Sequence, residues 1–125
     1  MAKSPGHQKW PNHSISEHRL DERVRVTVGG DTIADSSDVI RIDEDNHPPR
    51  YYFPRAGVQM DKLSRTETTS ECPFKGVASY YSLDAGGEKM EDVVWTYENP
   101  YDEHDVLKDR LAFYTEKIPN VEIEL

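Results

Sequence analysis

The sequence has little cysteine, a low apolar content and no long hydrophobic run. Only one of its 125 residues is a cysteine, so neither an intramolecular disulfide nor a cysteine-rich zinc site can form. No stretch approaches the roughly 18 consecutive apolar residues of a membrane-spanning helix. The N-terminal stretch also lacks the apolar centre of a signal peptide. We therefore expect a cytoplasmic protein that does not associate with membranes.

Positive charge is also scarce. The chain has 15 lysine and arginine residues against 24 aspartate and glutamate residues, which gives a net charge of -9. A field of this sign repels phosphate backbones, so we do not expect nucleic-acid binding. An apolar fraction of 35% would suit a partly disordered chain, but seven Tyr, two Trp and three Phe indicate a folded core with many aromatic rings. At this length the core belongs to a single domain.

Alternating apolar residues predict a fold made mainly of β-strands. Val24, Val26 and Val28 alternate with charged or hydroxyl residues, and Gly29-Gly30 then supplies the positive φ angles of a two-residue hairpin turn. A proline-bounded loop is expected at 44–49. We expect compact, coiled antiparallel sheets, either barrel-like or of another complex β type. Further strands are predicted at 31–36, 38–43, 50–53, 58–63, 65–72, 77–83 and 91–97.

One α-helix is expected near the C-terminus, over 102–117. Leu107, Leu111, Tyr114 and Ile118 follow one another at spacings of four, three and four residues, which is the apolar stripe of a helix packed on a sheet. Acidic residues near its start and a lysine near its end would suit the helix dipole.

The first 20 residues differ in character from the rest of the chain. They contain Pro5 and Pro11 and almost no apolar periodicity. The sequence therefore predicts a flexible N-terminal arm over 1–20 and a single domain over 21–125.

Several segments together resemble a known family. In order along the chain they are GGDTIADS (29–36), HPPRYYFPR (47–55), the pair Met60-Asp61, ECPFKGVASYYS (71–82), VVWTYENP (93–100) and LAFYTEKI (111–118). This series is similar to the family called domain of unknown function 427, over about residues 22–120. The resemblance implies a compact fold of coiled antiparallel sheets and little about activity. The family is sometimes labelled nucleotidyltransferase-like.

Metal-dependent nucleotidyl transfer receives little support from the residues themselves. It requires paired carboxylates on a strand to hold metal ions and a Gly-Ser turn upstream to grip the triphosphate. The acidic run 43–45 lies at a proline-bounded loop, and Ser36-Ser37 is not a Gly-Ser turn. The spacing of the histidines favours no metal site. We expect a solvated acidic loop, no metal and no required cofactor.

The single cysteine, Cys72, has two interpretations. As a nucleophile it would need a nearby cation, which Lys75 could supply, and a base, for which His47 is the best candidate. As a structural residue it would be a small, buried side chain beside a Pro-Phe turn. The second interpretation is favoured, because no histidine is adjacent in the sequence. We therefore expect the thiol to react slowly in the folded protein.

The segments YYFPR and CPFKG predict a pocket for a small anionic ligand. In this hypothesis Arg55 and Lys75 hold the anionic group, Asp61 orients it or acts as a general base, and Tyr52 and Tyr80 form the walls. If the pocket is catalytic, the candidates are Asp61, Cys72 and Lys75. Lys75 is expected to lie on a turn with few packing contacts.

A non-enzymatic protein-interaction module is the alternative. It would dock a partner through an aromatic face on an acidic surface. The two hypotheses differ in what they require of the structure. The ligand site needs an enclosed pocket with clustered cations, whereas the interaction module needs a flat, exposed aromatic patch of more than a few hundred Å².

Overall fold

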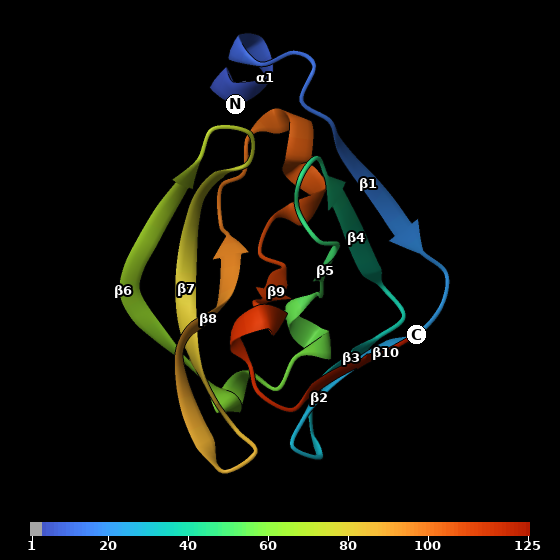
Figure 1. Cartoon of the computed structure of the whole chain (residues 1–125), viewed down its shortest axis with the longest axis vertical. Helices are drawn as coiled ribbons and strands as arrows, with labels where there is room; N and C mark the ends of the chain where they lie inside the picture. The colour runs from blue at the N-terminus through green and yellow to red at the C-terminus, as the bar shows by residue number, and fades with distance from the viewer. Residues whose placement is uncertain (1–3) are drawn as a thin grey trace.

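The computed structural model describes residues 4–125, in which ten strands form three antiparallel sheets (Figure 1). In spatial order, the first sheet contains β1 (Ile15–Leu20), β4 (Val39–Glu44) and β5 (Arg50–Tyr52). The second contains β10 (Val121–Glu124), β2 (Val24–Val28) and β3 (Asp31–Ser36). The third contains β6 (Leu63–Cys72), β7 (Gly76–Ala85), β8 (Glu88–Tyr97) and β9 (Leu111–Phe113).

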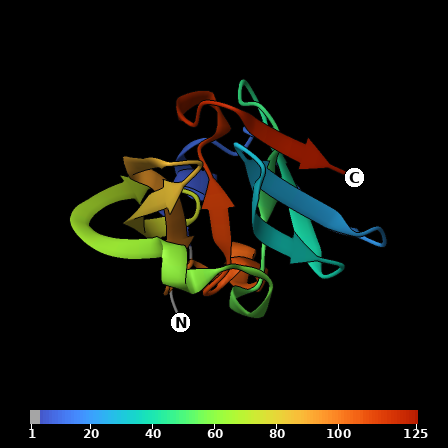
Figure 2. The same ribbon diagram turned by 90° about the horizontal axis from the view of Figure 1, so that it is seen from below.

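The first and third sheets meet beside β5 and β9. Phe53 and Leu111 exchange two backbone hydrogen bonds, each of 2.8 Å, just beyond the end of β5. Seen from below, β9 lies between the two groups of strands (Figure 2). The sheets therefore wrap around a shared interior without closing into a barrel. The expectation of a mainly β fold of antiparallel sheets is confirmed.

The predicted hairpin at β2 and β3 is confirmed. The three valines of β2 are buried while the residues between them are half-buried, as strict alternation requires. Gly29 and Gly30 have φ angles of 55° and 90°. A Cβ atom on Gly29 would lie 3.0 Å from the Cα of Gly86, which is in the β7–β8 turn. The two turns therefore pack closely, and Asp31 Oδ2 accepts a hydrogen bond of 2.9 Å from the backbone N–H of Gly86.

The buried side chains form two clusters. The larger is centred on the valines of β2 and includes Phe53, Leu83 and Phe113. The smaller lies where β4 and β5 face β7, β8 and β9. Its buried members are Ile40, Ile42, Tyr52, Ala78, Trp95, Tyr97, Leu107 and Ala112. This second cluster forms the floor of the candidate site.

The predicted C-terminal α-helix over 102–117 is wrong. The segment consists of a 3₁₀ helix η3 (Asp102–Leu107), strand β9 and a second 3₁₀ turn η4 (Thr115–Lys117). Asp109 has a φ angle of 60°, which interrupts any helix. The backbone N–H and C=O of Leu111 both form hydrogen bonds with Phe53, so neither is available for the hydrogen bonds of an α-helix. Pairing with a distant strand has overridden the helical spacing of the apolar residues.

A strand predicted at 58–63 is also absent. Two 3₁₀ turns, η1 (Arg55–Gly57) and η2 (Met60–Lys62), lead directly into β6. One backbone hydrogen bond closes each turn. The N–H of Val58 donates to the carbonyl of Arg55, and the N–H of Lys62 donates to the carbonyl of Gln59. The neighbouring prediction of a strand over 65–72 is confirmed by β6.

The segment predicted as a flexible arm contains regular structure. Residues 1–3 lie outside the described part of the chain. Helix α1 (Pro5–Lys9) is followed by β1, which pairs with β4 along its whole length, from Ile15 opposite Glu44 to Leu20 opposite Val39. Residues 15–20 thus belong to the first sheet rather than to an arm. Among the helices described, none has the length and apolar character needed to cross a membrane.

Candidate functional site

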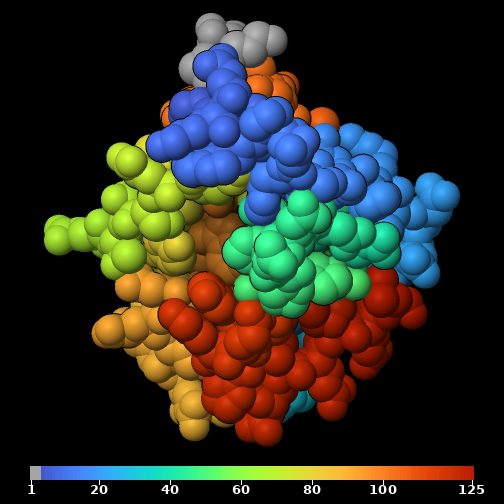
Figure 3. Space-filling model, turned by 45° about the horizontal axis from the view of Figure 1, so that its top comes forward, coloured from blue at the N-terminus to red at the C-terminus, as the bar shows by residue number. Residues whose placement is uncertain are grey.

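A cavity of about 420 Å³ opens where the first and third sheets face each other. Figure 3 shows it as a hollow below the N-terminal segment, between the β4–β5 loop and the end of β6. A volume of this size suits a small organic molecule. Six of its sixteen lining residues are Phe, Tyr or Trp, and several ionisable side chains gather at one end. The lining residues are His13, Ile42, Glu44, His47, Pro48, Arg50, Tyr52, Glu71, Cys72, Pro73, Phe74, Lys75, Tyr80, Trp95, Tyr97 and Tyr114.

Strand geometry explains why the aromatic side chains converge. Side chains two residues apart on a strand share a face, so Trp95 and Tyr97 of β8 both point toward the cavity. Tyr80 of β7 lies directly opposite Trp95 in the strand register. Tyr52 approaches from β5, and its ring lies edge-on to Trp95 at a centroid distance of 6.2 Å. The floor of the cavity is therefore built from two facing sheets.

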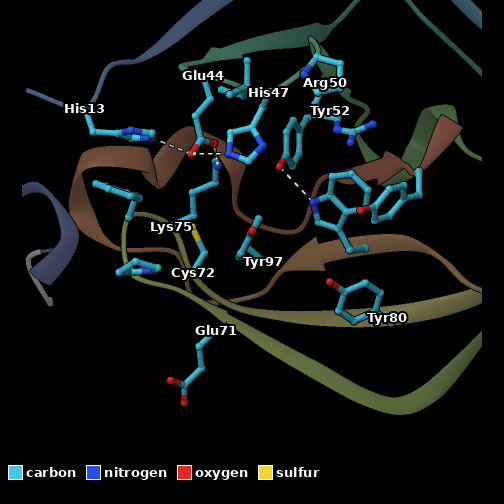
Figure 4. A pocket seen from close by; sticks show the side chains of 16 residues that line it. His13, Glu44, His47, Arg50, Tyr52, Glu71, Cys72, Lys75, Tyr80 and Tyr97 are labelled. Carbon is cyan, nitrogen blue, oxygen red and sulfur yellow. Dashed lines mark hydrogen bonds and ion pairs between the residues drawn. The ribbon is translucent and has the colours of Figure 1, made fainter. Parts of the chain in front are cut away.

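A buried ion pair occupies the polar end of the cavity. Lys75 is only 6% exposed, and its Nζ lies 2.5 Å from Oε1 of Glu44. His13 Nε2 donates to the second oxygen of Glu44 at 2.9 Å, and His47 Nε2 lies 3.6 Å from that oxygen (Figure 4). A buried ammonium group needs such a partner, because leaving water uncompensated costs several kcal/mol. Glu44 therefore organises three basic side chains.

The ion pair lowers the pKa of the Glu44 carboxyl group. Burial by itself would raise the pKa of Glu44, but the hydrogen bonds from Lys75 and His13 and the charge of Lys75 outweigh that effect and lower it. The carboxylate is therefore ionised near neutral pH. The Lys75 ammonium commits one N–H to Glu44, and its other two find no acceptor among the side chains and carbonyls of residues 4–125.

Two buried phenols add further donors. Tyr52 Oη accepts a hydrogen bond of 3.0 Å from Trp95 Nε1, while its own proton has no acceptor in the described chain. Tyr97 is 7% exposed, and its hydroxyl has no hydrogen-bond partner in the described chain. Burial raises the pKa of both tyrosines, so both hydroxyls stay protonated. The floor of the cavity thus carries two O–H groups with protons to donate.

Arg50 serves as a wall of the cavity. Its guanidinium donates two hydrogen bonds to Glu116, of 2.6 and 2.7 Å, and lies 5.4 Å from the ring centre of Trp95 and 5.0 Å from that of Tyr114. The hydrogen bonds from Arg50 lower the pKa of Glu116 to about 2. Two of its five N–H donors are used in this ion pair, and the stacked guanidinium contributes a flat surface to the wall.

Four of the residues predicted from sequence line the cavity. Tyr52, Cys72, Lys75 and Tyr80 are all present, together with His47. Lys75 lies on the β6–β7 turn as predicted, but the expectation of few contacts is wrong, because the side chain is buried in an ion pair. Cys72 is half-buried at the wall, and within residues 4–125 no hydrogen bond joins it to His47. The thiol therefore lacks a paired base.

The other two predicted residues, Arg55 and Asp61, lie elsewhere. They are on the turns η1 and η2, and neither lines the cavity. Arg55 Nη1 donates to Tyr81 Oη at 3.3 Å, and Tyr81 points to the face of β7 opposite that of Tyr80. The predicted convergence of Arg55 with Lys75 does not occur. The carboxylate that lies beside Lys75 is that of Glu44 and not that of Asp61.

Glu44 was interpreted from sequence only as part of a solvated acidic loop. Ile40 and Ile42 occupy the inward face of β4, and one further step of the same alternation places Glu44 on that face. Asp43 points to the other face, where it pairs with Arg41 and His18. The acidic run therefore does not present adjacent carboxylates to one site. No group of three or more His, Cys, Asp or Glu side chains that could hold a metal ion is found in the described chain.

Comparison with known proteins identifies the family. A family model described as "Domain of unknown function (DUF427)" matches residues 17–124, so the chain belongs to this family. The resemblance seen in the signature segments is thereby confirmed. A search of curated proteins finds no match. The geometry of the cavity is therefore the main guide to what the chain does.

Proposed function

We propose that the cavity binds a small planar molecule that carries a carboxylate. The observation that carries this proposal is a set of donors that line the cavity: two N–H bonds of Lys75 and the hydroxyl protons of Tyr52 and Tyr97 have no acceptor in the described chain. A few convergent polar groups in a mostly apolar cavity are the usual means by which a protein orients a small ligand. A ligand that supplies several oxygen acceptors would satisfy them together.

The remaining walls favour a flat, apolar body for this ligand. Trp95 and Tyr114 are held edge to face at 5.5 Å, and Phe74 and Tyr80 add further ring surface. Aromatic faces bind flat rings well. A carboxylate with one negative charge is favoured over a phosphate dianion, because Glu44 lies beside the donors and repels a second negative charge more strongly.

The interaction-module hypothesis receives less support. It requires a contiguous, exposed aromatic patch. The large apolar side chains that are exposed in residues 4–125 are Trp10, Val77, Val106 and Leu125, of which only one is aromatic. They come from different elements of the fold. Nucleotidyl transfer is also less favoured, because Asp43 and Glu44 point to opposite faces of β4.

A thermal-shift experiment tests the proposed ligand class. Benzoate, nicotinate and indole-3-carboxylate are added to the wild-type chain, with inorganic phosphate for comparison. We expect at least one aromatic carboxylate to raise the melting temperature by linkage. Tyr97→Phe should weaken that binding by about tenfold or more, because a hydrogen bond to a charged group is worth roughly 1.5–3 kcal/mol. Tyr101→Phe, outside this cavity, is the matched control. Failure of every carboxylate to stabilise the wild type would refute the proposal.

Cys72 offers an independent test of ligand location. It is the only thiol in the chain and lies at the cavity wall, so labelling with iodoacetamide reports on a single position. We expect slower labelling in the folded protein than in urea, and slower labelling again as benzoate fills the cavity. Mass spectrometry measures both rates. If benzoate binds but leaves the labelling rate unchanged, it occupies a different site.

A further inference from the structure

The N-terminal segment (residues 4–14) lies against the cavity although it precedes the family match, which begins at residue 17. Figure 3 shows this segment along the upper rim of the hollow. A tight seat for α1 and the side chain of His13 join it to the cavity wall, and a histidine pair anchors it to η3.

The seat of α1 is formed by the turn between β6 and β7. The backbone N–H of Gly6 and the hydroxyl of Ser4 both donate to the carbonyl of Pro73, each at 2.7 Å. Gly6 is buried there, and a Cβ atom on it would lie 2.7 Å from Phe74 Cδ1 and from the Pro73 carbonyl. Only glycine fits this contact. Pro73 and Phe74 also line the cavity, so α1 rests on the back of the cavity wall.

A histidine pair fastens α1 to a second element. His7 Nε2 lies 2.9 Å from His104 Nε2 in η3. His104 is 3% exposed, and its Nδ1 lies 2.8 Å from Glu17 Oε2. Because a carboxylate only accepts hydrogen bonds, His104 Nδ1 is the donor to Glu17. His7 does not line the cavity, so this contact anchors the segment without touching the site.

His13 is the residue of the segment whose side chain lines the cavity. Its ring stacks on Phe74 at a centroid distance of 4.4 Å and an interplanar angle of 21°. Its Nε2 donates to Glu44 Oε2, while the other oxygen of the same carboxylate accepts from Lys75. His13 thus helps to hold the carboxylate that orients the Lys75 ammonium.

We infer that the N-terminal segment is a working part of the ligand site, with His13 as a positioning residue that acts through Glu44 on Lys75. The inference rests on the proposed binding of aromatic carboxylates and adds a coupling to it. Docking of the segment and binding of the ligand stabilise each other. By linkage, the factor by which docking raises ligand affinity equals the factor by which the ligand favours docking.

Trypsin cleavage after Lys9 in the full chain measures docking, because Lys9 is the last residue of α1 and is exposed. Saturating benzoate should slow this cleavage in the wild type. Gly6→Val removes the close contact of α1 with Pro73 and Phe74, so it should speed the cleavage. It should also weaken benzoate binding by about 5- to 100-fold, a usual range of coupling between sites. His7→Ala should act in the same direction, and it provides the test if Gly6→Val does not fold.

Substitutions of His13 separate positioning from docking. His13→Ala should weaken benzoate binding while leaving the cleavage rate after Lys9 closer to that of the wild type. His13→Gln, which keeps an N–H donor for Glu44, should restore part of the affinity. His18→Ala is the matched control, because His18 is on β1 and pairs with Asp43 outside the cavity.

The outcomes distinguish this inference from the proposal on which it rests. If benzoate and nicotinate bind the wild type but Gly6→Val and His7→Ala speed cleavage without changing affinity, the coupling is refuted and the binding proposal stands. If neither carboxylate binds the wild type, both are refuted. If His13→Ala binds benzoate as tightly as the wild type does, His13 has no positioning role.

Discussion

Replacing Lys75 by methionine is expected to lower the free energy of unfolding by about 3 kcal/mol, the lower end of the cost of removing one partner from a buried ion pair. Methionine retains most of the side-chain volume, so the loss arises from the Glu44 carboxylate, which is left buried without its ammonium partner. His13 still donates to Glu44 and limits the damage. Urea unfolding of wild type and variant measures the difference. The substitution should also abolish detectable stabilisation by benzoate.

Two further variants make this expectation specific. Lys89→Met removes an exposed lysine from β8 and should change stability by less than about 0.5 kcal/mol. The double variant Lys75→Met with Glu44→Gln should recover at least half of the loss, because no buried charge remains unpaired. If Lys75→Met lowers the free energy of unfolding no more than Lys89→Met does, the buried pair contributes nothing to the stability of the fold.

The same pair predicts a definite dependence on pH. The folded state lowers the pKa of Glu44, so its contribution to stability is present above the unfolded value of about 4.3 and is lost as pH falls through the lower folded value. Without Lys75, burial raises the pKa of Glu44 and reverses the sign. The stability deficit of Lys75→Met should therefore shrink as pH falls from 7 toward 4. A deficit that grows on acidification would contradict this assignment.

Replacing Phe53 by alanine is expected to lower the free energy of unfolding by about 3–5 kcal/mol, the usual cost of deleting a buried phenyl ring. Phe53 is fully buried, and its ring lies edge-on to Phe113 at 5.8 Å and 77°. Its backbone also joins the first sheet to β9 through Leu111. The cavity left by the ring would open at the junction of two sheets. Chemical denaturation monitored by circular dichroism measures the loss.

Phe53→Leu is the matched control for this substitution. It keeps an apolar side chain and should cost only about 1–1.5 kcal/mol. Phe53 belongs to the larger buried cluster, whereas the cavity floor belongs to the smaller one. The leucine variant should therefore bind benzoate as the wild type does. A large loss of binding would mean that the two clusters are energetically coupled.

Most of the strands follow from short sequence patterns, because the signals for strands and hairpin turns are local. Alternation of Val24, Val26 and Val28 was sufficient to predict β2, and Gly29-Gly30 was sufficient to predict its turn. The aromatic residues and the CPFKG segment also supplied several of the residues that line the cavity. Each of these features depends on neighbouring residues along one stretch of chain.

Which distant segments meet depends on contacts made in the folded chain. Leu111 lies in a strand because β9 pairs with β8 and because Phe53 bonds its backbone from the other side, although the local spacing predicted a helix. Lys75 is buried against Glu44, which is 31 residues away, and Glu44 is also held by His13, a residue with no periodic signal around it. Arg55 lies away from the cavity, where it contacts Tyr81. Tyr81 and the cavity-lining Tyr80 point to opposite faces of β7, because they are adjacent residues of one strand. The pairing of strands depends on contacts between residues far apart in sequence, and local patterns do not specify that choice.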